Sequence, residues 1–124
     1  MKKVSILFVD DEKDVLDSFR AGLTERGYDI VTASTGAEAL EILNSFIPDI
    51  IFADLRMQPM NGFDLFHQVK KDVKLSRIPF FFLTAVDDFL AQKYGEKLGV
   101  DAYITKPVDL DSLDTLIKNK ISES

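Results

Sequence analysis

Residues 78–83 read Ile-Pro-Phe-Phe-Phe-Leu, and this stretch decides the fold class. A strand that faces water on one side alternates polar and apolar residues, whereas a strand that is covered on both faces is apolar almost throughout. We therefore expect this segment to be a strand of a parallel sheet that is sandwiched between helices. Its phenylalanines then belong to the hydrophobic core and do not form a cofactor site.

Similar apolar runs are spaced along the whole chain, and stretches with helical periodicity lie between them. The expected strands are Val4–Val9, Tyr28–Ala33, Ile50–Ala53, Phe80–Leu83 and Ala102–Thr105. The expected helices are marked in order by Val15, Phe19 and Leu23; by a capping box of Thr35 and Glu38; by Leu65, Phe66, Val69 and Val73; by Leu90, Tyr94 and Leu98; and by Leu110, Leu113 and Ile117. This alternation predicts an α/β fold of flavodoxin-like type, a doubly wound five-stranded parallel sheet with strand order 2-1-3-4-5 and five helices.

Length and composition limit what the chain can be. The 124 residues are enough for one hydrophobic core, so we expect a single domain over residues 1–124, with a frayed tail at about 121–124. Direct binding to nucleic acid is not expected, because 15 basic residues are scattered among 21 acidic ones. The sequence has no cysteine, which excludes disulfides and thiolate metal sites. It shows neither a membrane span nor a signal peptide, so we expect a cytoplasmic protein without membrane contact.

Chemically active side chains stand directly after the expected strands. Ligands of doubly wound sheets bind beyond the carboxyl ends of the strands. Taken singly, each of these residues has a structural explanation, such as capping a helix, ending a strand or lying on the surface. Together they predict a site at one edge of the sheet: Asp10, Asp11 and Glu12 follow the first strand, Asp54 the third, Thr84 the fourth, and Lys106 with Pro107 the fifth.

The acidic residues of this edge predict a metal. Asp10, Asp11 and Asp54 would place like charges within a few ångströms, which costs free energy without a counter-charge. Hard oxygen ligands in a small open site suit Mg²⁺, which commonly binds one or two carboxylates and a phosphate. Lys106 has a separate role, because its ammonium can meet one phosphoryl oxygen while the Thr84 hydroxyl donates to another.

In their order and combination, these motifs resemble the receiver domains of bacterial two-component response regulators, in particular the single-domain chemotaxis-type receivers. The resemblance runs from Ile6 to about Leu116. The motifs that carry it are Asp10-Asp11, Asp54, Asn61-Gly62, Thr84-Ala85 and Tyr103-Ile104-Thr105-Lys106-Pro107.

The resemblance implies a role for each matching residue. Asp54 would be the phosphoacceptor. Asp11 and Asp54 would bind Mg²⁺ directly, Asp10 would act largely through water, and the backbone carbonyl of Arg56 would complete the protein's ligands. Lys106 would contact the phosphoryl group.

The resemblance also implies a switch. Thr84 would move toward the phosphoryl group, Tyr103 would be the aromatic switch residue, and the Lys106–Pro107 bond would be cis. Two departures stand out. Gln58 occupies a position that is usually proline, with Pro59 one residue later, so the loop after Asp54 is expected to take a different path. Ala102 replaces an aspartate that is used in one common mode of dimerisation.

The expected function is phosphorelay signal transduction. A sensor histidine kinase or a phosphotransfer protein would donate a phosphoryl group to Asp54, and the surface around Tyr103 would then bind an unknown downstream protein or an attached output domain. The domain would catalyse only its own phosphoryl transfer and autodephosphorylation, and is not expected to be an enzyme otherwise.

Three other functions share some of these features. A dehalogenase-type phosphatase is disfavoured because Arg56 stands where its general acid would be. A flavodoxin is disfavoured because the acidic residues 10–12 would repel a phosphate. A degenerate receiver that acts as a phosphorylation-independent interaction module is the remaining alternative. His67, the single histidine, is expected on the surface.

Overall fold

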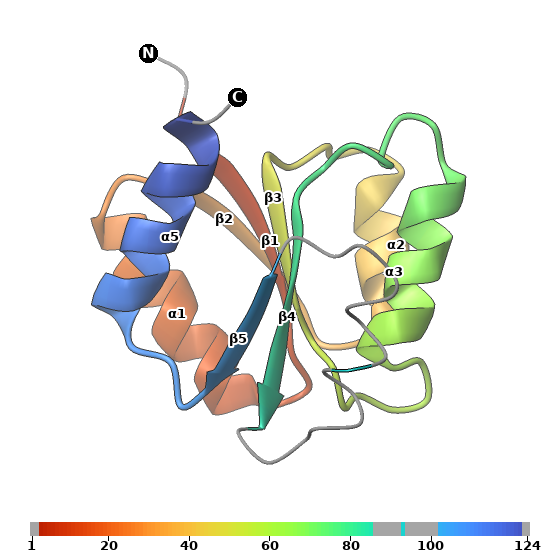
Figure 1. The fold of residues 1–124 in the computed structure, drawn as a ribbon, viewed down its shortest axis with the longest axis horizontal. Coiled ribbons are helices and arrows are strands. Elements are labelled where there is room, and N and C mark those ends of the chain that lie inside the picture. The colour runs from red at the N-terminus through yellow and green to blue at the C-terminus, as the bar shows by residue number, and fades with distance from the viewer. Residues whose placement is uncertain (1–2, 86–92, 94–101, 123–124) are drawn as a thin grey trace.

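A computed structural model describes residues 3–85, 93 and 102–122 of the chain. It contains one parallel sheet of five strands in the order β2-β1-β3-β4-β5, so the predicted sheet and its strand order are confirmed (Figure 1). The strands are β1 (Ser5–Val9), β2 (Asp29–Ala33), β3 (Ile50–Asp54), β4 (Phe80–Ala85) and β5 (Ala102–Lys106). Each agrees with its expected apolar run to within two residues.

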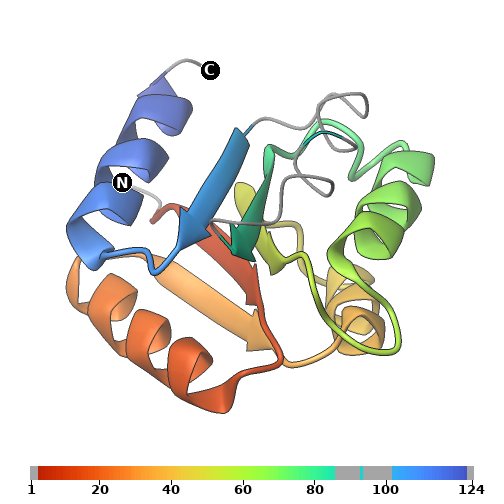
Figure 2. The ribbon, with the colours of Figure 1, turned by 60° about the horizontal axis from the view of Figure 1, so that its bottom comes forward.

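Helices cover both faces of the sheet. α1 (Lys13–Glu25) and α5 (Leu110–Ser122) lie on one face, and α2 (Gly36–Leu43) and α3 (Gly62–Lys71) lie on the other (Figures 1 and 2). The structure thus has four helices in its described part, where the sequence predicted five for the whole chain. The missing one, expected around Leu90, Tyr94 and Leu98, lies outside the described residues.

The hydrophobic core has two halves, because alternate residues of each central strand point to opposite faces. In β4, Phe80 and Phe82 pack in the half that α2 and α3 cover, whereas Phe81 and Leu83 pack in the half that α1 and α5 cover. All four side chains are buried. The continuous apolar run is therefore explained by burial on both faces, and the prediction that its phenylalanines are core residues is confirmed.

The prediction that Val73 lies in α3 is wrong. Val73 was expected on the apolar face of this helix, but α3 ends at Lys71 and the Val73 side chain is 90% exposed. The chain turns away because Asp72 has extended backbone angles and its carboxylate accepts a hydrogen bond from the backbone N–H of Lys74 at 2.8 Å. Leu75 enters the core in place of Val73.

The capping box predicted at the start of α2 forms only in part. The Thr35 hydroxyl accepts a hydrogen bond from the backbone N–H of Glu38 at 3.0 Å, as expected. The Glu38 carboxylate, however, accepts from the N–H of Ser34 and not from that of Thr35. A complete capping box occurs instead at the start of α3, between Asn61 and Asp64.

At the C-terminal end of the chain, α5 continues to Ser122 and so includes two residues that were expected to be frayed.

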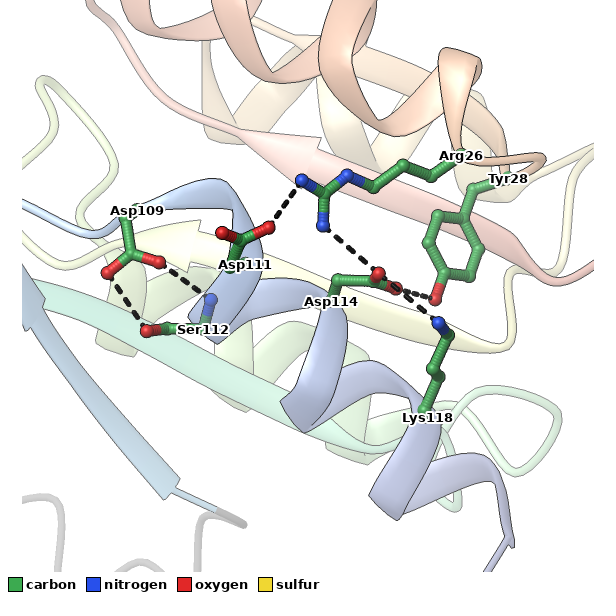
Figure 3. A network of polar contacts seen from close by, with 7 residues as sticks. All are labelled: Arg26, Tyr28, Asp109, Asp111, Ser112, Asp114 and Lys118. Atoms are coloured by element: carbon green, nitrogen blue, oxygen red, sulfur yellow. Dashed lines mark hydrogen bonds and ion pairs between the residues drawn. The ribbon is translucent and has the colours of Figure 1, made fainter.

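A polar network joins the turn between α1 and β2 to α5 (Figure 3). The Tyr28 hydroxyl donates a hydrogen bond to the carboxylate of Asp114, which is buried. Arg26 contacts Asp114 at 3.1 Å and Asp111 at 2.6 Å, and Lys118 lies 3.3 Å from Asp114. The hydrogen bond from Tyr28 is the main reason why the pKa of Asp114 is lowered, and those from Arg26 and Lys118 add to it. No sequence pattern predicted this network.

Candidate functional site

Three charged side chains meet where the strands end. Asp10 directly follows β1, Asp54 is the last residue of β3, and Lys106 is the last residue of β5. The Lys106 ammonium lies 3.2 Å from an Asp10 carboxylate oxygen and 3.5 Å from an Asp54 carboxylate oxygen. The strands are parallel, so their carboxyl ends lie at the same edge of the sheet, which is turned toward the viewer in Figure 2.

Asp10 is completely buried at this edge. One of its carboxylate oxygens accepts the backbone N–H of Glu12 at 3.0 Å, and the other accepts a hydrogen bond from Lys106. Burial raises the pKa of Asp10 above its ordinary value, although both hydrogen bonds and the charge of Lys106 act in the opposite direction. The Asp10 carboxylate is thus hydrogen-bonded through both oxygens, yet its burial makes ionisation unfavourable.

Asp54 has the same kind of environment. Its side chain is only 8% exposed, and burial and the charge of Asp10 raise the pKa of its carboxyl group. Lys106 and a hydrogen bond from the Arg56 backbone act against this shift. For Lys106 itself, burial alone would lower the pKa, but the surrounding carboxylates raise it, so the ammonium stays charged. Among the described residues, the carboxylates of the site carry more negative charge than the Lys106 ammonium can neutralise.

The donor atoms of the site suit a hard divalent cation. Among the described residues, carboxylate oxygens of Asp10, Asp11 and Glu12 all lie within 4.8 Å of one another. Asp54 is not part of this group, but it lies near enough for the charges of Asp10 and Asp11 to raise the pKa of its carboxyl group, and Lys106 contacts both Asp54 and Asp10. Oxygen ligands and excess negative charge are the conditions that Mg²⁺ prefers, so these residues fit that ion.

Two further predicted site residues, Thr84 and Tyr103, lie on β4 and β5. Thr84 is buried at the end of β4, and its hydroxyl lies 3.5 Å from the carbonyl oxygen of Ala85. Tyr103 lies at the other end of β5 from Lys106; its ring is half-buried and packs 5.7 Å from that of Phe82.

In the part of the chain that the structure describes, the Lys106–Pro107 and Gln58–Pro59 peptide bonds next to the site are cis. Arg56, whose backbone carbonyl was expected to serve as a metal ligand, is exposed and stands two residues after Asp54. His67 is exposed on α3, as predicted from the sequence.

Sequence reasoning gave no role to two residues that contact the site. The Glu12 carboxylate lies 3.4 Å from the Lys106 ammonium, and a third acid after the first strand was the only signal for it. Gly62 lies so close to the end of β3 that a Cβ atom there would be 2.7 Å from the Asp54 carbonyl oxygen. Its N–H donates to the carbonyl oxygen of Leu55 at 3.0 Å.

Comparisons with known proteins show which family the chain resembles. Residues 6–118 match the family model of the response regulator receiver domain. The chain is 36% identical over 123 residues to the transcriptional regulatory protein GlrR of Escherichia coli, covering 99% of this chain and 27% of that protein. It is 40% identical over 102 residues to the response regulator SaeR of Staphylococcus epidermidis, covering 82% of this chain and 43% of that protein. The chain therefore spans less than half the length of these two relatives.

A solved structure gives the same result. The signal receiver domain of a histidine kinase from Syntrophus aciditrophicus superposes with a TM-score of 0.88 at 30% identity, covering 97% of this chain and 91% of that one. In the described part of this chain, no helix has the length and apolarity to cross a membrane. From its fold, its strand-end residues and its relatives, the chain belongs to the response regulator receiver domain family, the signalling switches of two-component systems.

Proposed function

We propose that this domain accepts a phosphoryl group on Asp54 in a Mg²⁺-dependent reaction. The donor is a phosphohistidine of a sensor histidine kinase or a phosphotransfer protein. The observation that carries the proposal is the buried Asp54 carboxylate, which has an ammonium 3.5 Å away and whose pKa is raised by the charges of Asp10 and Asp11. This arrangement offers a nucleophile, a positive charge for a phosphoryl oxygen, and oxygen ligands for a cation.

The reaction follows from these positions. An Asp54 carboxylate oxygen attacks the phosphorus, an O–P bond forms, and the N–P bond to the donor histidine breaks with its electron pair going to the imidazole nitrogen. Lys106 carries a fixed positive charge to the phosphoryl oxygens, where the transition state spreads negative charge. Asp10, Asp11 and the Arg56 carbonyl, together with Asp54, would hold Mg²⁺, which when bound neutralises charge on the same oxygens. Water later attacks the acyl phosphate and regenerates Asp54.

The test is labelling by a small phosphodonor. With acetyl phosphate and Mg²⁺, intact-mass spectrometry should show one added phosphoryl group on the wild type and none on Asp54→Asn. Asp29→Asn is a matched control, because this exposed aspartate begins β2 at the opposite end of the sheet. Asp11→Ala should lose Mg²⁺ binding in titration calorimetry and should label slowly. Equal labelling of the wild type and Asp54→Asn would reject the assignment, whereas no labelling of either protein would favour the phosphorylation-independent interaction module.

We also propose that phosphorylation is read through Thr84 and Tyr103 by a downstream protein or an attached output domain. Tyr103 supports this because its ring is only half-buried against Phe82, so an inward and an outward rotamer can be close in free energy. Ala102 lacks the carboxylate used in one common dimer, which favours a different partner. Beryllofluoride with Mg²⁺ should shift the NMR signals of Tyr103, and signals that change only around Asp54 would contradict this part of the proposal.

A further inference from the structure

We propose that Glu12 is a positioning residue that holds Lys106 in the unphosphorylated domain and competes with the incoming phosphoryl group for it. This inference rests on the proposed phosphorylation of Asp54, because only a phosphoryl group there gives Lys106 a second partner. Its basis is the Glu12–Lys106 contact of 3.4 Å, which joins the start of α1 to the end of β5.

The Glu12 side chain is not used for the task that its position suggests. Glu12 is the N-cap residue of α1, and N-cap side chains commonly accept a hydrogen bond from the first turn of their helix. Here the side chain makes no such hydrogen bond, and the carboxylate contacts Lys106 instead. The backbone of Glu12 fixes its place, because its N–H donates to Asp10 and its carbonyl accepts from Leu16 at 3.1 Å.

Lys106 has to give up a partner when a phosphoryl group arrives. An ammonium has three N–H donors, and carboxylates of Asp10, Glu12 and Asp54 lie at 3.2, 3.4 and 3.5 Å from it. The three carboxylates differ in the free energy that is lost when Lys106 moves away from them. Asp10 has no solvent exposure and Asp54 has 8%, so leaving either one unpaired is expensive.

Glu12 is the partner that Lys106 can leave at the lowest cost in free energy. Its side chain is 63% exposed, so water can solvate the carboxylate as soon as Lys106 moves away. Asp10 and Asp54 also suffice to keep Lys106 in the site without Glu12. Removing the Glu12 contact should therefore free Lys106 for the phosphoryl group without displacing it, and phosphorylation should become faster.

The opposing explanation is that this contact is an ordinary surface ion pair. Such a pair has little effect on stability and none on the reaction. The two explanations predict the same melting temperature for Glu12→Gln but different rates of phosphorylation. The rate with a small donor is therefore the deciding measurement, since a small donor also removes any effect of Glu12 on docking of a partner protein.

The experiment compares wild type and four variants at saturating Mg²⁺ with acetyl phosphate, with intact-mass spectrometry as the readout. Glu12→Gln removes the charge and weakens the contact, and Glu12→Asp keeps the charge but shortens the side chain by one methylene. Glu25→Gln makes the same charge change at the other end of α1. Wild type is the reference, and Asp54→Asn is the blank for labelling.

We expect Glu12→Gln and Glu12→Asp to be phosphorylated about two- to fivefold faster than wild type, the factor that a weak ion pair contributes to an equilibrium. Glu25→Gln should react at the wild-type rate, and the melting temperatures of the Glu12 and Glu25 variants should agree with that of the wild type within a degree or two. The advantage of Glu12→Gln should also shrink toward about 1 M salt, where charges are screened within about 3 Å.

Other outcomes overturn the inference in recognisable ways. A faster Glu12→Gln with an unchanged Glu12→Asp would show that the negative charge repels the donor and that the contact with Lys106 is irrelevant. Equal or slower rates for both variants would show that Glu12 does not compete for Lys106. A more than tenfold loss of Mg²⁺ affinity in Glu12→Gln would show that Glu12 is a metal ligand. If wild type and Asp54→Asn label alike, the proposed function itself fails, and this inference fails with it.

Discussion

Replacing Gly62 by alanine tests how closely the start of α3 fixes the phosphoacceptor strand. A Cβ atom at this position would lie 2.7 Å from the Asp54 carbonyl oxygen and 2.9 Å from the Leu55 Cα atom. Ordinary van der Waals contact begins near 3.4 Å, so the backbone at the end of β3 has to move by about 0.7 Å. Both atoms belong to the main chain, so no side-chain rotation can relieve the clash.

The expected cost combines two opposing effects. Overpacking of this kind costs about 1–3 kcal/mol of unfolding free energy. Alanine recovers about 0.4–1 kcal/mol by restricting the unfolded chain, since Gly62 has no positive φ in the structure. We therefore expect a net loss of about 1–2 kcal/mol. A displacement of this size at the nucleophile should also slow phosphorylation about tenfold, because catalytic geometry tolerates less than 1 Å.

Gly36→Ala provides the matched control. Gly36 is also the first residue of its helix, α2, but its Cβ atom would meet the Met60 side chain, with the sulfur at 2.5 Å. Methionine is flexible and can move aside. Urea denaturation and acetyl phosphate labelling of both variants provide the comparison. If Gly62→Ala is as stable and reacts as fast as Gly36→Ala, the close approach to Asp54 does not position the nucleophile.

Three further predictions follow from the burial and hydrogen bonds of particular side chains. In Mg²⁺-free buffer at pH 7, Asp54→Asn should raise the melting temperature by a few degrees, because a carboxyl group with a raised pKa destabilises the folded state when it is ionised. Calorimetry should show this gain disappear as the pH falls below the ordinary value of 3.8. Asp114→Ala should cost about 1–3 kcal/mol near neutral pH and Tyr28→Phe about 1 kcal/mol. The lowered pKa of Asp114 means that its contribution is present above pH 3.8 and is lost below it, so denaturation curves of Asp114→Ala that parallel the wild type at every pH would contradict this role. Val73 is exposed and Val69 is buried, so Val73→Ser should change the unfolding free energy by less than about 0.5 kcal/mol, whereas Val69→Ala should lower it by about 2 kcal/mol. Similar losses for the two variants in urea denaturation would mean that α3 continues past residue 71.

The sequence alone determined the sheet and the edge at which the site lies. Apolar runs such as residues 78–83 report burial on both faces, because each residue of a strand points to one face or the other. Parallel strands bring their carboxyl ends to one edge, so the places of Asp10, Asp54 and Lys106 followed from the chain order of the strands. These inferences need only local periodicity and a topological rule.

Local periodicity was wrong where a turn competed with it. Val73 continues the spacing of the apolar residues of α3, and the sequence pattern therefore included it in the helix. The hydrogen bond between the Asp72 carboxylate and the Lys74 N–H ends the helical path, and the exposed Val73 is the result.

Only the tertiary structure decided which side chains meet. Glu12 and Lys106 are 94 residues apart in the sequence, and Tyr28 and Asp114 are 86 apart, so no spacing rule connects them. The carboxylate of Glu12 lies within 4.8 Å of those of Asp10 and Asp11 and contacts Lys106, whereas Asp54 stands on another strand. Such contacts depend on how the helices and loops pack on the sheet, and that packing is set by the whole core.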